Sequence, residues 1–357
     1  MRRVATAVVL AVLVVRVAIA ADTLPERLSD EEFWRIATEF SERAGTFQSD
    51  NLLSNERWFQ HVLPSLVQRA KQDRVYVGVG PEQNFTYIVA LKPKMAFIVD
   101  VRRGNFDFHL MYKALFEMSA DRAEFVSRLF SRPRPEGVTA KSTAEDIFAA
   151  IANEQATDTL YSRNMRAIVN HLTKVHQFQL SSADILRMQH IYNAVYVYGP
   201  SIQYSTTTNA GRRITREPTY AELMKAVDQG GFEHSFLATE DAFLWMKKFE
   251  TENRLVPLMG DFAGPKALRA VGQYLSERHA TVAAFYLSNV EEYLKQDGKQ
   301  TTFCENASTL PIDDTSTFIR SSRSGTPDLG FELVSELAPM KSDLAACSAV
   351  NEVRSEK

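Results

Sequence analysis

The chain has 357 residues, of which 45% are apolar, and its formal net charge is −3 at pH 7. This length and apolar content suffice to bury a large core, as one elaborated domain or as two smaller ones. Because acidic residues outnumber basic ones, we expect no nucleic-acid partner.

The N-terminus has the pattern of a secretory signal peptide. Arg2 and Arg3 precede an apolar run over residues 5–15, and small residues end at Ala20. This pattern predicts cleavage after Ala20, and the run is too short to remain as a transmembrane anchor. Its removal takes three arginines and no acid, which leaves a charge of −6. We expect a periplasmic or secreted protein without a transmembrane anchor; an uncleaved N-terminal membrane anchor is the alternative.

Helices are expected before the first strand. Ser29 and Glu32 match a capping box, and the apolar residues that follow recur at helical spacing. A second apolar-periodic segment covers about residues 56–70 and leads into the strand that begins at Val75. These helices are predicted to pack beside the sheet.

Residues 75–100 read as a strand, a glycine turn, a helix and a second strand that ends in Asp100. A glycine turn between a strand and a helix lets backbone amides approach a ligand closely. An acid at the end of the next strand can hold ribose hydroxyls. Asp100 follows Gly80 by twenty residues, a spacing that fits a nucleotide-type cofactor pocket.

One or two helices are predicted over residues 106–131, followed by a large helical insertion at about residues 133–235. A Pro-Arg-Pro-Glu-Gly segment opens this insertion, and residues 204–213 read as a polar loop. Three capping signatures mark helix starts within it: Ser142 with Glu145, Ser181 with Asp184, and Thr219 with Glu222.

A second strand, turn, helix and strand unit is predicted from residue 254 to residue 289, with a last short strand at residues 315–319. Alternating strands and helices with short connections imply a mostly parallel sheet that is covered on both faces. We therefore predict an α/β fold: a Rossmann-like, doubly wound sheet within residues 21–320, followed by a C-terminal tail at residues 321–357.

The chain has two cysteines, Cys304 and Cys347. In an oxidising compartment they can form a disulfide that joins the tail to the body; two unpaired thiols are the alternative. Neither cysteine lies at metal-ligand spacing from a histidine, so no zinc site is expected there.

The glycine turn carries four candidate cofactor-binding residues. Gly78 and Gly80 are expected to allow close backbone approach, and Glu82 and Asn84 lie where the next helix starts. Because helix N-termini attract anions, Glu82 would compete with a pyrophosphate for this position. This favours a cofactor without phosphates, such as S-adenosylmethionine. A tight turn without a ligand is the alternative.

Three further candidates end predicted strands. Asp100 can accept hydrogen bonds from ribose hydroxyls, or form a salt bridge with Arg102 or Arg103. Asp261 can face an adenine amino group, or only form a turn; Asn289 can line the reacting side of the pocket, or cap a helix.

Other catalytic signals are weak, so the catalytic residues stay unassigned. His109 and Glu117 are predicted on a helix near Asp100, while His234 lies in a loop; a histidine without an identified partner is more often structural. The sequence has no Gly-x-Ser-x-Gly elbow, no His-Glu-x-x-His motif and no P-loop, which removes the usual support for hydrolase, zincin and NTPase functions.

The segments 78–88, 97–103, 112–117 and 285–291 resemble a bacterial family of hypothetical proteins with a Gly-Val-Gly-Pro-Glu-Gln-Asn signature. More widely, the chain is similar to class I S-adenosylmethionine-dependent methyltransferases. That resemblance implies that Gly78 and Gly80 match two motif glycines, that Asp100 matches the ribose acid and that Asp261 lies on the adenine side. Tyr76 replaces the acid of the first motif, and Glu82 replaces its third glycine.

Two functions follow as hypotheses. The first is a methyltransferase-like protein that binds S-adenosylmethionine, with an unidentified acceptor. The second is an exported, non-catalytic Rossmann-like binding protein of the cell envelope. It would use Tyr204 and the basic residues Arg212, Arg213 and Arg216 for a small-molecule ligand or a partner. The absence of a third glycine and the presence of Glu82 disfavour a nicotinamide-dependent oxidoreductase.

Overall fold

The computed structural model describes residues 22–204, 217–326 and 330–355. Within them the chain is a mixed α/β protein with a six-stranded sheet in the order β3-β2-β1-β4-β5-β6. The first five strands run parallel, and β6 is antiparallel to β5. The strands are β1 (Val75–Gly78), β2 (Met95–Asp100), β3 (Leu255–Met259), β4 (Val282–Ser288), β5 (Thr317–Thr326) and β6 (Gly330–Pro339).

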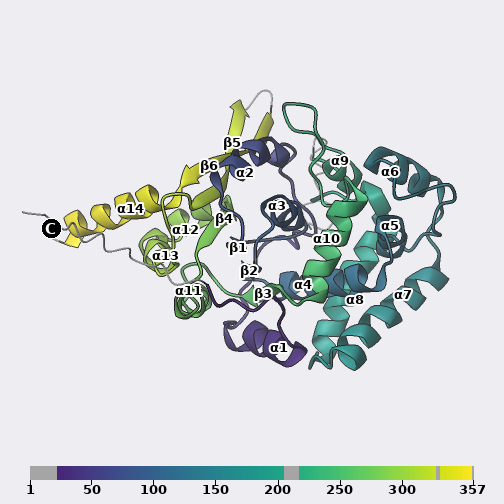
Figure 1. Cartoon of the computed structure of the whole chain (residues 1–357), viewed down its shortest axis with the longest axis horizontal. Helices are drawn as coiled ribbons and strands as arrows, with labels where there is room; N and C mark the ends of the chain where they lie inside the picture. Colours follow the sequence, from purple (N-terminus) through teal and green to yellow (C-terminus); the bar gives the residue numbers. More distant parts are fainter. Residues whose placement is uncertain (1–21, 205–216, 327–329, 356–357) are drawn as a thin grey trace, which may run out of the picture.

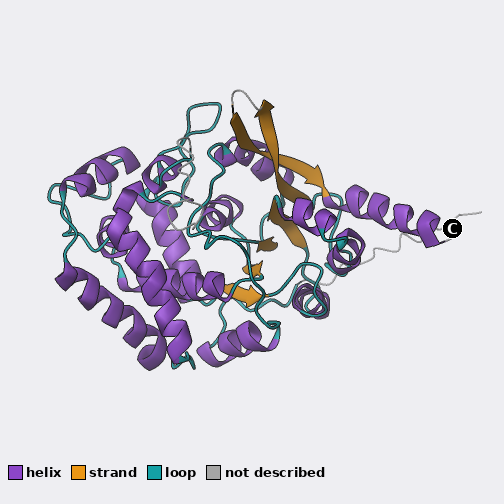
Figure 2. Cartoon of the chain, turned by 180° about the vertical axis from the view of Figure 1, so that it is seen from behind, coloured by secondary structure: helices purple, strands orange, loops and turns teal. Residues whose placement is uncertain are grey.

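Helices cover both faces of the sheet (Figures 1 and 2). On one side lie α3 (Gln83–Leu91), α4 (Arg103–Met118) and α10 (Glu240–Thr251). On the other side lie α11 (Ala267–Glu277), α12 (Val290–Gln296) and α13 (Gln300–Ala307). The predicted mostly parallel sheet with covered faces is confirmed at this level.

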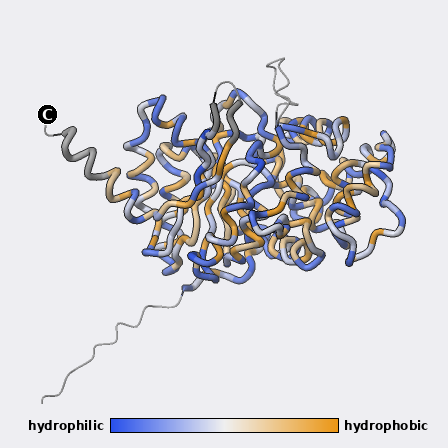
Figure 3. Tube along the Cα trace, turned by 90° about the horizontal axis from the view of Figure 1, so that it is seen from above, coloured by the Kyte–Doolittle hydropathy of each residue, from blue (hydrophilic) through white to orange (hydrophobic). Residues whose placement is uncertain are grey.

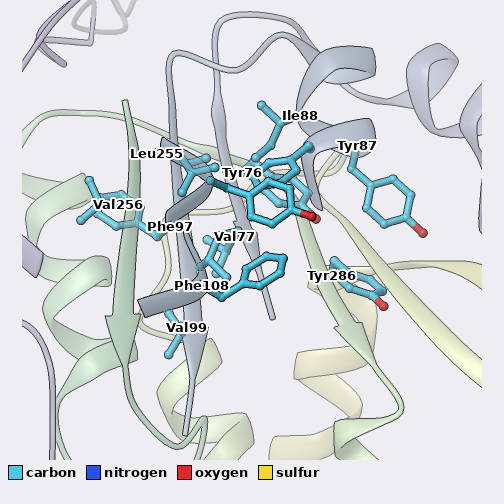
Figure 4. Close-up of a cluster of buried hydrophobic side chains, with 14 of the residues drawn as sticks. Tyr76, Val77, Tyr87, Ile88, Phe97, Val99, Phe108, Leu255, Val256 and Tyr286 are labelled. Carbon is cyan, nitrogen blue, oxygen red and sulfur yellow. The ribbon is translucent and has the colours of Figure 1, made fainter. Parts of the chain in front are cut away.

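The strands are apolar because they are buried on both faces. Every residue of β1 and β2 is buried, as expected for parallel strands between two helix layers. Aromatic side chains of β1, α3 and β4 lie near one another in this core, among them Tyr76, Tyr87 and Tyr286 (Figure 4). Hydrophobic segments lie mainly in the interior of the molecule, and hydrophilic segments are common at its periphery (Figure 3).

The predicted helical insertion is present. After α5 (Arg122–Leu129), residues 133–235 contain only helices and loops among their described residues, on the side of α4 away from the sheet (Figure 1). A five-residue π-helical turn, η2 (His171–Val175), extends α7 directly. The other elements are α6 (Ala144–Asn153), α7 (Asp158–Asn170), α8 (Ser182–Tyr198), the 3-10 turn η3 (Gly199–Ser201) and α9 (Tyr220–Met224).

The N-terminal segment also follows the prediction. Helix α1 (Asp30–Glu39) has Ser29 as its N-cap, whose hydroxyl accepts from the Glu32 amide at 3.1 Å. The segment before β1 forms a 3-10 turn, η1 (Phe59–Val62), and helix α2 (Leu63–Arg69).

Two predicted capping boxes are confirmed, at Ser181 with Asp184 and at Thr219 with Glu222. The third prediction, Ser142 with Glu145, is wrong by one residue, because Thr143 and Asp146 form the capping box of α6. Both pairs have suitable side chains at the same spacing. In the structure the hydrogen bonds are made by Thr143 and Asp146, at the start of a helix that buries Ile147 and Ile151.

The C-terminal part differs from the prediction of a short strand and a tail. Strand β5 begins at Thr317 and is twice as long as predicted, and it is followed by β6 and by α14 (Met340–Ser355). Residues 320–326 carry mostly polar side chains, which gave no strand signal, yet their backbone pairs with β6. Cys304 of α13 and Cys347 of α14 form a disulfide. Within the described residues, no helix is both long and apolar enough to cross a membrane.

Candidate functional site

A cavity of about 470 Å³ opens where β1, β2, β3 and β4 end. Because these strands are parallel, their carboxyl ends meet at one edge of the sheet. The volume lies within the range of about 300–1,000 Å³ that is usual for small-molecule sites. Its wall is formed by the loops that follow the four strands, by residues 42–56 and by Tyr204.

The side chain of Asn84 holds the turn after β1 through hydrogen bonds. Its amide nitrogen donates to the carbonyls of Val79, Gly80 and Pro81 at 2.9, 3.2 and 2.8 Å. Its amide oxygen accepts from the Tyr76 hydroxyl at 2.8 Å. Gly80 has a φ of +78° and lines the cavity. Asn84 therefore fixes the shape of the turn and is not part of the cavity wall.

Gly78 is also outside the cavity wall, and its role is steric. A Cβ at this position would lie 2.1 Å from the amide oxygen of Asn84 and 2.8 Å from a ring carbon of Tyr76. Gly78 therefore makes room for the side chains that hold the turn.

Glu82 is buried beside the cavity rather than in its wall. One carboxyl oxygen accepts from the Ser54 amide at 3.1 Å, while the other has no protein partner. Burial raises the pKa of Glu82 to about 8, and the nearby Glu56 carboxylate acts in the same direction. Glu82 is thus mostly protonated at neutral pH, and its carboxyl group is screened from a ligand.

Asp100 and Arg102 both line the cavity as an ion pair. Asp100 Oδ1 accepts from the amide and from Nε of Arg102, both at 2.9 Å, and Oδ2 accepts from Nη2 at 2.6 Å. The two side chains are 5% and 9% exposed. Asp100 therefore forms the salt bridge that was the alternative to ribose binding, and its partner is Arg102 rather than Arg103.

Asp261 and Asn289 lie in the same wall. Asp261 forms the expected turn, because Oδ1 accepts from the Ala263 amide at 2.9 Å. Its second oxygen accepts from Lys299 Nζ at 2.9 Å. Asn289 is the N-cap residue of α12. The cavity thus brings together Gly80, Asp100, Asp261 and Asn289.

Glu56 is a functional candidate that the sequence did not single out. It lines the cavity, and its buried carboxylate accepts four hydrogen bonds from neutral side chains. The donors are Tyr286 (2.6 Å) and Ser288 (2.7 Å) on one oxygen, and Gln83 and Ser335 (both 3.0 Å) on the other. In the sequence, Ser54-Asn55-Glu56 read only as the start of a helix, so no local signal distinguished this glutamate.

Glu42 is a second residue that sequence reasoning missed. Its Oε1 accepts from the amides of Lys266 and Ala267, at 2.9 and 2.7 Å, at the start of α11. Gly264 leaves the space for it, because a Cβ there would lie 2.2 Å from Glu42 Oε2. The amides that begin α11 are therefore occupied by the protein's own carboxylate.

Acidic side chains outnumber basic ones in the cavity wall. The acids are Glu42, Glu56, Asp100, Asp261 and Asp297, and the bases are Arg43, Arg102 and Lys299. Such a site favours neutral or cationic ligands over anions.

The two histidines considered from the sequence are absent from this wall. His109 Nε2 lies 2.9 Å from the Gly80 carbonyl, and burial lowers the pKa of His109 to about 4. The neutral ring therefore donates to the turn. His234 lies 2.8 Å from Asp228 in a loop of the insertion. Both contacts agree with structural roles.

Fold and site together define a mixed α/β protein with a ligand-sized, mainly acidic cavity at the carboxyl edge of a mostly parallel sheet. The chain belongs to the family described as Domain of unknown function (DUF7790), whose sequence model matches residues 52–196 and 201–346. Both matched segments contribute cavity residues, Gly80 and Asp100 from the first, Asp261 and Asn289 from the second. No curated protein matches the chain.

Proposed function

We propose that this protein binds S-adenosylmethionine in the cavity and is a methyltransferase-like protein with an unidentified acceptor. The observation that carries the proposal is the place of the cavity. It lies where β1 and β4 are neighbours, so that the chain leaves β1 toward β2 on one side and enters β4 on the other. In open α/β sheets, ligands bind at this switch point, and the strand order is that of Rossmann-like, doubly wound proteins.

The cavity wall suits a nucleoside without phosphates. Gly80 allows close backbone approach, and the Asp100 carboxylate has lone pairs left for ribose hydroxyls. Asp261 is available to an adenine amino group. The amides at the start of α11 are occupied by Glu42, and the first turn of α12 carries Glu291 and Glu292, so neither helix offers a free anion site.

The excess of carboxylates supports a cationic ligand. S-adenosylmethionine carries an ammonium and a sulfonium group, and bound there it supplies an electrophilic methyl group. The protein's own contribution is proximity and alignment. Glu56 brings a buried carboxylate from a different segment, which compensates for Tyr76 at the position of the motif acid. Four hydrogen-bond donors occupy both of its oxygens, so Glu56 would act on a bound cation through its charge rather than through a direct hydrogen bond.

A second candidate function is an exported, non-catalytic Rossmann-like binding protein of the cell envelope. The observation in its favour is that both oxygens of Asp100 are already bonded to Arg102. Tyr204 lies in the cavity wall, whereas Arg212, Arg213 and Arg216 fall outside the described residues. So do residues 1–21, and export therefore stays a prediction. The Cys304–Cys347 disulfide supports it.

Isothermal titration of the purified protein with S-adenosylmethionine and S-adenosylhomocysteine tests the proposal. We expect saturable binding that Asp100→Asn and Asp261→Asn each weaken by about ten-fold to a hundred-fold, because a hydrogen bond to a charged group contributes about 1.5–3 kcal/mol. Asp241→Asn, an exposed change in the first turn of α10, is the matched control and should bind like the wild type.

The outcomes separate the two functions. Absence of binding by both ligands would exclude the cofactor proposal and leave the binding-protein function. Binding that is equal in Asp100→Asn, Asp261→Asn and the control would place the ligand elsewhere.

A further inference from the structure

A histidine and glutamate cluster lies outside the cavity. Glu117, near the end of α4, meets His171 and His176 at the two ends of the π-helical turn η2. Glu117 Oε2 lies 2.5 Å from His171 Nε2 and 2.6 Å from His176 Nε2. Because α4 rises by about 1.5 Å per residue, the cluster is about 20 Å from the cavity edge at Arg102.

The π-helical turn is what puts both imidazoles on one side. Its wider spacing pairs the His176 amide with the His171 carbonyl five residues earlier, at 3.1 Å. Such turns are rare and often lie at functional sites. The His176 ring also stacks on Phe178, with ring centroids 4.9 Å apart, which fixes its orientation.

The hydrogen bonds around His176 leave a lone pair that needs a cation. Its Nδ1 lies 2.9 Å from Asp30 Oδ1, a carboxylate oxygen that can only accept, so Nδ1 carries the proton. In the neutral ring, Nε2 then has a lone pair directed at the carboxylate oxygen of Glu117. Two acceptors at 2.6 Å require a cation, which is either a second proton on the ring or a metal ion bound by both atoms. With an ion bound, the two atoms would move apart to slightly more than about 3 Å, the spacing of ligands in a tetrahedral site.

The surroundings resemble the outer shell of a metal site. The carboxylate of Asp30 orients the ring nitrogen opposite to the ligand nitrogen, as partners of metal-binding histidines commonly do. Asn253 Nδ2 in turn donates to Asp30 Oδ1 at 2.8 Å. The buried Lys113 ammonium donates to the other oxygen of Glu117, Oε1, at 2.7 Å, and so leaves Oε2 free for an ion.

We propose that Glu117 Oε2, His171 Nε2 and His176 Nε2 bind a divalent transition-metal ion of the zinc class. Two imidazoles and one carboxylate suit zinc, copper, nickel or iron better than magnesium or calcium, which prefer oxygen ligands. Three protein ligands leave room for water on the side of His171, which is the most exposed of the three at 19%. The ion would join the insertion to α4, with α1 attached through Asp30.

The experiment uses the full chain, stripped of metal by a chelator and then titrated with Zn²⁺, Co²⁺ and Mg²⁺. We expect about one equivalent of Zn²⁺, a visible d–d absorption band with Co²⁺, and a higher Tm with Zn²⁺ but not with Mg²⁺. Each of His171→Asn and His176→Asn should weaken Zn²⁺ binding by at least about ten-fold. Asp30→Asn should weaken it by about ten-fold, the lower end of outer-shell effects.

The matched control is His190→Asn, because His190 is a 65%-exposed histidine of α8 that bonds Asp50 and no residue of the cluster. Zn²⁺ binding below about a tenth of an equivalent, or equal in all histidine variants, would overturn the proposal. The cluster would then be an imidazolium–carboxylate pair. Circular dichroism shows whether the variants fold. If they do not, the wild type alone tests the proposal: absence of the Co²⁺ d–d band and of a Tm rise with Zn²⁺ would overturn it.

Discussion

At the scale of single residues, the turn after β1 shows how sequence signals and structural roles diverge. Gly78 and Gly80 both predicted close backbone approach to a ligand, but only Gly80 lines the cavity. Gly78 leaves space for Asn84 and Tyr76 instead. A Gly-x-Gly pattern therefore predicts a tight turn reliably, while the role of each glycine depends on side chains that pack later.

Gly78→Ala tests this steric role. The added Cβ would lie 2.1 Å from Asn84 Oδ1, and relief requires breaking the bonds that hold the turn. We expect a loss of about 1–3 kcal/mol of unfolding free energy, typical of overpacking. Gly104→Ala, in the first turn of α4, meets no atom within 4 Å and should be neutral or slightly stabilising. Urea unfolding of both variants measures the difference; equal stability would remove the steric argument.

Glu82→Gln tests the buried carboxyl group. Because the folded-state pKa of Glu82 is raised to about 8 from 4.5, the folded state binds an extra proton between these values. Its contribution to stability is full below about pH 4.5 and is lost as the pH rises through 8. As the pH rises through this window, the unfolding free energy of the wild type should therefore fall relative to that of Glu82→Gln, by at most about 1.4 kcal/mol per pH unit.

The same measurement has an internal check. His109 has its pKa lowered to about 4, so its contribution is lost as the pH falls through that value, and it opposes Glu82 only below about pH 6.5. Because both proteins contain His109, its contribution cancels in the difference between them, and the effect of Glu82→Gln should change across the window from pH 4.5 to about 8 in denaturant titrations. The Glu56 carboxylate, Tyr112 and Tyr220 lie near this carboxyl group. Burial raises the pKa of both tyrosines well above the usual value, so the two phenols stay neutral in that range. A difference that does not vary with pH would show that Glu82 is ionised throughout.

The residues that the sequence missed share one property. Glu42 and Glu56 act through partners far away in the chain, the amides of Lys266 and Ala267 for the first and Tyr286 and Ser335 for the second. Local patterns carry no information about such contacts. By contrast, Asp100, Asp261 and Asn289 were found because they end strands, and strand ends are visible in the apolar pattern.

At the scale of elements, the two strand–turn–helix–strand units were predictable because their strands are continuous apolar runs. As expected, β1 begins at Val75 and β2 ends at Asp100, and β3 begins at Leu255, one residue after the expected start. Strand β6 was missed for the opposite reason. It pairs along its whole length with β5, in which only residues 317–319 gave a strand signal, while residues 320–326 are mostly polar and predicted no hairpin.

The disulfide attaches the C-terminal helix α14 to the rest of the fold. Cys304 and Cys347 join α13 to α14 across 43 residues of chain. A closed loop of this length is expected to stabilise the fold by about 2–4 kcal/mol. The double change Cys304→Ser and Cys347→Ser should therefore lower the Tm and make α14 the first site of proteolysis. The wild-type protein under reducing conditions should show the same lower Tm and the same cleavage. An unchanged Tm in both experiments would mean that the disulfide does not stabilise the fold.

At the scale of the whole molecule, topology explains why distant segments form one cavity. Parallel strands place their carboxyl ends at the same edge, so residues within the segments 42–56, 79–81, 99–102, 260–262 and 286–299, together with Tyr204, meet there. The five acids and three bases of this wall then set the charge of that edge. Selectivity for the charge of a ligand is accordingly a property of the whole carboxyl edge rather than of one residue.

This charge balance makes a prediction about ligands as a class. S-adenosylmethionine should raise the Tm more than S-adenosylhomocysteine at equal concentration, because only the former has the sulfonium charge. Saturation at one hundred times Kd corresponds to about 2.7 kcal/mol, enough for a rise of a few degrees. Salt should reduce the advantage of the sulfonium compound, since the cavity is open to solvent and charges are screened over about 10 Å at 0.1 M ionic strength. NAD and ATP, whose phosphates would meet Glu42, should give no shift, and a larger Tm rise with either of them would refute the assignment of the cavity to a phosphate-free nucleoside.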